Sequence, residues 1–297
     1  MDPDELYTLR NRFWLGNFQM AIAEGNNLTR LPAALMVERD EFVYRCYIGL
    51  GQYNLVLSQI KDDAALPLRA VKLLAKYMSS PEASKDTVLA QLVEWSKDSS
   101  SAQNRTVQLV SALVYEKEDM MNEAFGAIHA RATMEHVALY AQFCLKINRP
   151  DVAEKQLKKL MEQDEDATLT QLVSAWVNLA LGGTKLADAA YAYEELIDKF
   201  EPSLSLLNGL ACCKLHAHKW AEAEAHLLQA LGKGQNDADT LINLITCSHH
   251  AGKSADVVSR YASQLFDAHP DHPYVVKMKR AEAQFDRVAS TMAVDVK

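Results

Sequence analysis

Residues 207–230 read LNGLACCKLHAHKWAEAEAHLLQA, and the pattern of apolar and small residues in this stretch returns 34 residues later and 34 residues earlier. In the stretch itself these positions are Leu207, Leu210, Ala211, Trp220, Ala223, Leu227 and Ala230. The next copy has Leu241, Leu244, Ile245, Ser254, Val257, Tyr261 and Gln264. The preceding copy has Val173, Trp176, Val177, Leu186, Ala189, Tyr193 and Leu196. A fixed period of this length predicts stacked two-helix units that offer a long groove.

Weaker copies of this unit cover the rest of the chain. One unit around Tyr140 precedes the regular copies by about 36 residues, and the units nearer the N-terminus are less regular. The sequence therefore predicts an all-α solenoid of about eight helix pairs, in a single domain that spans 1–297. Irregular units are expected in 1–132, regular units in 133–270, and a C-terminal capping helix in 271–297.

Proline and glycine mark the expected ends of the helices. Pro81, Pro202 and Pro273 each stand where a helix can begin, because proline is tolerated in the first turn. Gly182-Gly183 and Gly252 fall at expected turns between paired helices.

Composition excludes several functional classes. The chain has 297 residues, 49% of them hydrophobic, and a net charge of −8, which argues against binding to nucleic acid or to an anionic membrane. No apolar stretch approaches the ~20 residues needed to span a bilayer, and the acidic N-terminus does not resemble a signal peptide. Membrane contact is therefore expected only through partners. Five cysteines, an odd number, fit no disulfide framework and favour a reducing compartment.

No catalytic motif is present, so we expect no enzymatic activity, no cofactor and no metal. His216 and His250 occupy the same repeat position, and an enzyme with a site among the C-terminal histidines is an alternative that metal analysis would test. The cysteines are expected to fill crowded positions on inner helices.

Two resemblances narrow the interpretation. The unit, with Tyr53 and the Trp220-Ala221-Glu222-Ala223 run, resembles the tetratricopeptide repeat, which specifies a fold and not a function. Longer strings resemble the coatomer epsilon subunit family. They are DEDATLTQL at 164–172, AWV at 175–177, LLNG at 206–209, SQL at 263–265, DAH at 267–269 and VERD at 37–40.

The second resemblance implies a non-enzymatic, cytosolic vesicle-coat subunit, peripheral on Golgi membranes and coated vesicles. It implies a role in retrograde Golgi-to-ER transport and in transport within the Golgi. It also implies binding to the C-terminal domain of the coatomer alpha subunit, with the other coatomer subunits reached indirectly.

Partner binding is expected on the concave face, which the first helix of each pair lines. The candidate residues there are Leu139, Gln142, Asn178, Leu181, Asn208, Cys212, Leu215, Asn243 and Thr246. Asparagine amides suit the capture of an extended backbone, and apolar neighbours supply burial. The alternative is that these amides bond within their own helix layer.

A tetratricopeptide co-chaperone that binds an extended acidic peptide is the alternative function. Such proteins resemble one another in a basic clamp, and the matching positions here lack its cations. They are Ser174, Asn178, Gly209, Asp239 and Asn243.

Overall fold

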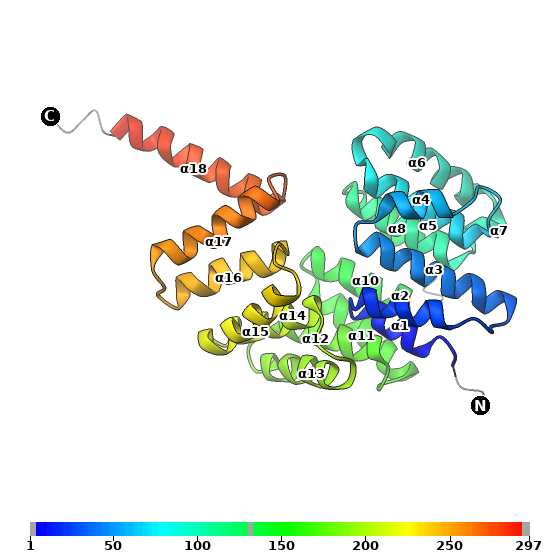
Figure 1. Ribbon diagram of the computed structural model, residues 1–297, viewed down its shortest axis with the longest axis horizontal. Coiled ribbons are helices and arrows are strands. Elements are labelled where there is room, and N and C mark those ends of the chain that lie inside the picture. The colour runs from blue at the N-terminus through cyan, green and yellow to red at the C-terminus, as the bar shows by residue number, and fades with distance from the viewer. Residues whose placement is uncertain (1–3, 130–132, 293–297) are drawn as a thin grey trace. The chain divides into compact units, whose positions relative to one another are not determined.

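The structure is a computed structural model that describes residues 4–129 and 133–292, in which every regular element is a helix (Figure 1). The chain divides into two compact units, residues 1–203 and 204–297. Among the described residues no helix has both the length and the hydropathy required to cross a membrane.

Unit 1 contains thirteen of the described helices. They are α1 (Tyr7–Trp14), α2 (Phe18–Asn27), α3 (Ala33–Gly49), α4 (Tyr53–Gln59), α5 (Leu66–Ser79), α6 (Pro81–Lys97), α7 (Ser99–Ala102), α8 (Arg105–Lys117), α9 (Met121–Ala127), α10 (Met134–Lys146), α11 (Pro150–Gln163), α12 (Thr168–Leu181) and α13 (Lys185–Phe200). Unit 2 contains α14 (Leu204–His216), α15 (Trp220–Lys233), α16 (Ala238–His250), α17 (Ala255–Ala268) and α18 (Pro273–Met292).

The helices pair as the period predicts. Eight consecutive pairs run from α1/α2 to α16/α17, with the short α7 between the third and fourth pairs and α18 at the end. The prediction of a tetratricopeptide-like solenoid of about eight pairs with a C-terminal helix is confirmed. That the chain forms one continuous domain stays a prediction.

The turn inside seven of the eight pairs contains a residue in the left-handed conformation. Such a residue ends a helix by turning the chain so that its last carbonyls find amide donors, and glycine adopts it without steric cost. The residues are Gly16, Gly51, Asp119, Asn148, Gly182, His218 and Gly252. Only some of these positions are glycine, so the sequence marks the turns unevenly.

Pro81 and Pro273 are the first residues of α6 and α18, as predicted. Pro202 differs, because α14 begins two residues later at Leu204 and the preceding Glu201 has φ +70°.

Small residues let the two helices of a pair approach closely. Ala189 in α13 and Ala223 in α15 are fully buried, at the repeat position where the period expects them. A fully buried leucine follows on the same face of each helix, Leu196 and Leu227 respectively. Because the seam holds a methyl group at its tightest point, larger side chains there would force the helices apart.

Within unit 1 the first helix contacts helices from the end of the unit. Helix α1 lies beside α12, and Trp14 packs against the cluster formed by α10, α11 and α12. The amide of Asn17 donates a hydrogen bond to the carbonyl of Phe200, 3.3 Å away and 183 residues further along the chain.

Candidate partner-binding surface

Polar side chains join the first helices of the two pairs in unit 2. Asp237 caps the N-terminus of α16 by accepting hydrogen bonds from the backbone N–H and the hydroxyl of Thr240, at 2.9 and 2.6 Å. Asn208 of α14 donates to the Thr240 hydroxyl at 2.8 Å, and its own amide oxygen accepts from Asn243 of α16 at 3.0 Å. Cys212 then donates weakly to the Asn243 amide oxygen. We call this row of five side chains the α14–α16 ladder.

The side-chain amide of Asn208 takes its hydrogen-bond partners from the α14–α16 ladder. Its amide nitrogen also donates to the carbonyl of Leu204, and the side chain is only 8% exposed. Every hydrogen-bonding group of this amide has a partner within the fold. The structure therefore shows the alternative, bonding within the helix layer, and a contact of Asn208 with a partner stays a prediction. Asn178 behaves similarly, since it donates to Ser174 of its own helix at 3.2 Å.

Leu139 is a second candidate that lies among the chain's own side chains. It is 9% exposed and packs with Ala112, Ala124 and Ile128 of the preceding pair. A step of 34 residues back from the buried Val173 lands on Leu139, whereas the spacing of about 36 residues read from the sequence moves it off that register. The irregular spacing around α10 hides that register in the sequence.

The remaining candidates keep accessible surface. Gln142, Leu181 and Thr246 are exposed, and Asn178, Cys212, Leu215 and Asn243 are half-buried. Gln142, Asn178 and Leu181 belong to unit 1, and the others to unit 2. Each set offers apolar and amide groups with few charges, which suits a peptide backbone better than a charged ligand.

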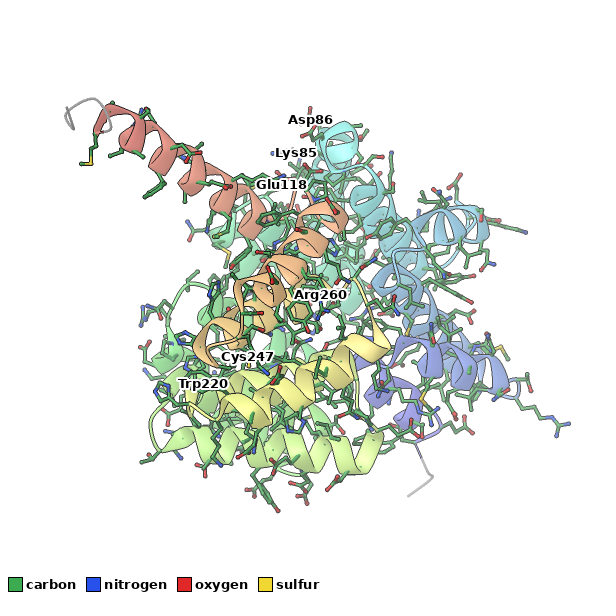
Figure 2. All side chains as sticks on the ribbon, turned by 60° about the vertical axis from the view of Figure 1, so that its left-hand side comes forward. Lys85, Asp86, Glu118, Trp220, Cys247 and Arg260 are labelled. Atoms are coloured by element: carbon green, nitrogen blue, oxygen red, sulfur yellow. The ribbon has the colours of Figure 1, made fainter. Side chains whose placement is uncertain are left out.

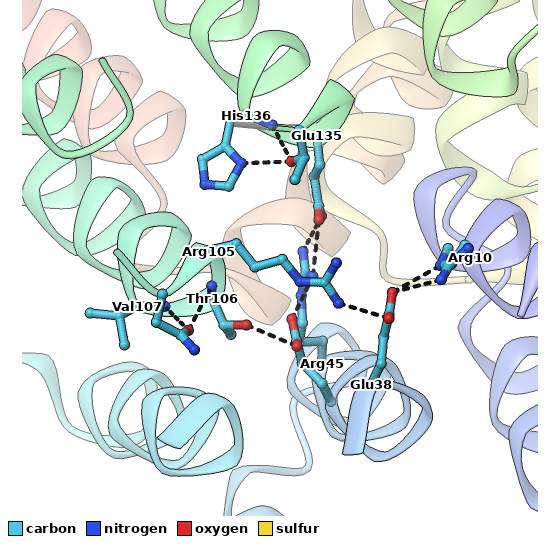
Figure 3. Close-up of polar contacts among 11 residues, drawn as sticks. Arg10, Glu38, Arg45, Arg105, Thr106, Val107, Glu135 and His136 are labelled. Atoms are coloured by element: carbon cyan, nitrogen blue, oxygen red, sulfur yellow. Dashed lines mark hydrogen bonds and ion pairs between the residues drawn. The ribbon is translucent and has the colours of Figure 1, made fainter. Parts of the chain in front are cut away.

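Sequence reasoning missed a charged cluster in unit 1, where α1, α3, α8 and α10 converge (Figure 3). The guanidinium of Arg45 pairs with Glu135, 90 residues away, and with Glu41 one helical turn earlier at 3.3 Å. Glu41 also accepts a 2.8 Å hydrogen bond from the hydroxyl of Thr106. Glu38, Arg10 and Arg105 complete what we call the unit 1 ion network, both arginines lying 2.8 Å from the Glu38 carboxylate.

The network sets the charge states of its members. Burial raises the pKa of Glu41, and the charge of Arg45 with the Thr106 hydrogen bond offsets only part of that effect. Burial acts in the same direction on Glu38, but the Arg105 hydrogen bond and the charge of Arg10 outweigh it, so the pKa of Glu38 is lowered. A cation–π contact also stabilises the network, since the guanidinium carbon of Arg45 lies 4.4 Å from the centroid of the Phe13 ring.

A cavity of about 280 Å³ adjoins the network, lined by all of its charged residues except Arg45 and by Trp14, Phe42 and Met134. The signal in the sequence was the spacing of four between Glu41 and Arg45, which places a carboxylate and a guanidinium together on one face of the helix.

The cysteines are packing residues, as expected. All five are free, and only Cys212 is more than slightly exposed. Cys247 lies against Trp220, with its sulfur 3.3 Å from the Trp220 carbonyl oxygen (Figure 2). Burial raises the pKa of Cys46 to about 12, so its thiol stays protonated and poorly nucleophilic at neutral pH.

Two of the C-terminal histidines pack against an aromatic side chain. The ring of His250 stacks on Trp220 with centroids 4.8 Å apart, and His218 meets the same ring edge-on. Within the described residues no three His, Cys, Asp or Glu side chains are grouped so that they could hold a metal ion.

Stacked helix pairs, small residues at the seams and left-handed turns define the class of the protein, a helical-repeat scaffold of the tetratricopeptide type. A solved tetratricopeptide repeat protein from Parabacteroides merdae shares this fold, with a TM-score of 0.58 at 12% identity over 79% of this chain and 93% of that one.

Full-length comparisons identify the family. The family model described as the coatomer epsilon subunit matches residues 2–293. Coatomer subunit epsilon-1 of Arabidopsis thaliana is 43% identical over 291 residues, covering 98% of each chain. Coatomer subunit epsilon of Dictyostelium discoideum is 33% identical over 96% of this chain and 98% of its own. The chain belongs to the coatomer epsilon subunit family, and is thus a subunit of a vesicle coat that associates with other coatomer subunits.

Proposed function

We propose that the chain is a structural subunit that binds the C-terminal domain of the coatomer alpha subunit and stabilises that part of the coat. The supporting observation is the end-to-end match to the family on a fold whose first helices present Gln142, Leu181, Leu215 and Thr246. In this proposal the other coatomer subunits are reached through the alpha subunit. The coat acts in retrograde Golgi-to-ER transport and in transport within the Golgi.

The proposed location is the cytosolic face of Golgi membranes and coated vesicles, with membrane contact only through the coat complex. A net charge of −8 supports this arrangement, because an acidic protein is repelled by anionic headgroups. Nucleic acid is not a proposed partner for the same reason.

Affinity capture from a cytosolic extract tests the proposal. The tagged full-length chain should retain the coatomer alpha subunit in near-stoichiometric amount together with the remaining subunits, identified by mass spectrometry. A capture that recovers other proteins and no coatomer would contradict it.

A further inference from the structure

The C-terminal helix α18 leaves most of its length without a neighbour. Val275 is buried against α16 and α17, and the Lys279 ammonium lies 5.9 Å from the Phe266 ring centroid. From Val276 to Met292 every residue is exposed, and Figure 1 shows the helix extending away from α16 and α17. Helices in proteins are stabilised chiefly by packing an apolar face, so this length of helix points to a partner.

The exposed part of α18 carries a heptad pattern. Apolar residues recur with spacings of four and three, which keeps them on one stripe along a helix. The stripe comprises Tyr274, Met278, Ala281, Phe285, Val288 and Met292. Phe285 is 73% exposed and Met292 68%. An alternation of this kind is the pattern by which one helix packs along another.

The charged residues that directly border the two edges of the stripe have opposite signs. Lys277 borders one edge, with Arg280 and Arg287 beyond it on the same side of the helix. Glu282 borders the other edge, with Asp286 and Lys279 beyond it. An anionic membrane is a poor match, because the carboxylates of Glu282 and Asp286 would lie at its surface.

We propose that α18 pairs in parallel with α18 of a second copy of this chain. In a parallel pair the edge residue of one helix faces the opposite edge of its partner five positions further on. Lys277 of one copy would therefore meet Glu282 of the other, twice by symmetry. In an antiparallel pair each edge meets its like, so Lys277 and Glu282 would not face each other. The charge pattern selects the parallel orientation.

The contact is small, and the association is correspondingly weak. Five stripe residues per copy, Met278 to Met292, are free to pack. They amount to about two heptads, whereas a stable coiled coil needs three to four. Such a pair has little effect on an isolated chain at low concentration. Inside a coat, where neighbouring subunits raise the effective concentration, it would link two copies.

Sedimentation equilibrium of the full-length chain tests the pairing. Between about 5 and 500 µM the weight-average mass should rise from that of one chain, 33.1 kDa, towards twice that value. Phe285→Glu should weaken the association at least about tenfold, because it places a charge in the central layer. Val276→Glu is the matched control, since Val276 is exposed on the same helix but lies off the stripe. Neither variant should change binding to the alpha subunit, which separates this proposal from the previous one.

A charge swap tests the orientation. Lys277→Glu and Glu282→Lys should each weaken the self-association, and the double variant should restore it, because the facing pairs are again opposite. A constant mass of one chain up to 500 µM would overturn the proposal, as would association that survives Phe285→Glu. A chain that stays monomeric and instead binds phosphatidylserine vesicles through Phe285 would also overturn it, in favour of a lipid surface.

Discussion

At the scale of single residues, the inner surface is shaped by polar groups that satisfy one another. The α14–α16 ladder uses amides and hydroxyls that sequence reasoning offered to a partner. The repeat was enough to predict that these residues lie on the inner face. It did not predict their hydrogen-bond partners, because an asparagine can bond a ligand or a neighbouring helix with equal chemistry.

Asn208→Ala should lower the free energy of unfolding by about 1–3 kcal/mol, because Thr240 and Asn243 lose a partner in a buried setting. The measurement is urea denaturation followed by circular dichroism. Thr246→Ala is the control, since Thr246 is exposed and bonds only within its helix. Equal effects of the two substitutions would refute the role assigned to the ladder.

Glu41 gives a prediction in pH. Burial favours the protonated form of Glu41, so its pKa in the folded state lies above the ordinary value of 4.5. The folded state gains stability from this preference below pH 4.5. That stability is lost as pH rises through the folded pKa. Glu41→Gln removes this titration. The stability of the variant relative to the native chain should therefore increase as pH rises from about 4 through the folded pKa.

Parallel denaturation series of the two proteins at several pH values measure this difference. A difference that stays constant, or that falls with rising pH, would contradict the assigned shift. Glu38, whose pKa is lowered, titrates in both proteins with the opposite sign and so cancels in the comparison.

At the scale of helices, the pairs follow from the 34-residue period and from turn chemistry. Gly252 sits in a left-handed turn with no atom near the place of a side chain, so its requirement is purely one of backbone conformation. Gly252→Ala should cost about 1 kcal/mol of stability for that reason. Thermal unfolding measures the loss.

The reverse change is the matched test. Asn148 adopts the same conformation with an exposed side chain, and Asn148→Gly should be neutral or slightly stabilising. If Gly252→Ala were harmless and Asn148→Gly costly, the turn account would be wrong.

At the scale of the whole molecule, the sequence predicted the pairing of neighbouring helices but not the contacts between residues that are far apart in the chain. Hydrogen bonds such as Asn17 to Phe200 and Arg45 to Glu135 join residues 183 and 90 positions apart. A local period fixes how each pair meets the next, whereas contacts between distant pairs depend on small rotations summed over the intervening repeats. The irregular spacing before α10 hid those rotations, and with them the register of Leu139 and the unit 1 ion network.

Arg45→Ala should loosen unit 1 alone, since it leaves Glu41 and Glu135 without their cation at a cost of about 3 kcal/mol. Hydrogen exchange followed by mass spectrometry should show faster exchange in α3, α8 and α10. Exchange in α14–α17 should be unchanged. Uniform acceleration over all helices would show that the two units do not open independently.

The most direct test of the central claim is a calorimetric titration of the chain with the purified C-terminal domain of the coatomer alpha subunit. Leu181 and Leu228 are both exposed leucines, at 42% and 46%, but Leu181 lies on a first helix and Leu228 on a second. Binding should be one-to-one, and Leu181→Glu should weaken it by at least about tenfold, whereas Leu228→Glu should leave it unchanged. Absence of binding, or equal loss in the two variants, would contradict the claim.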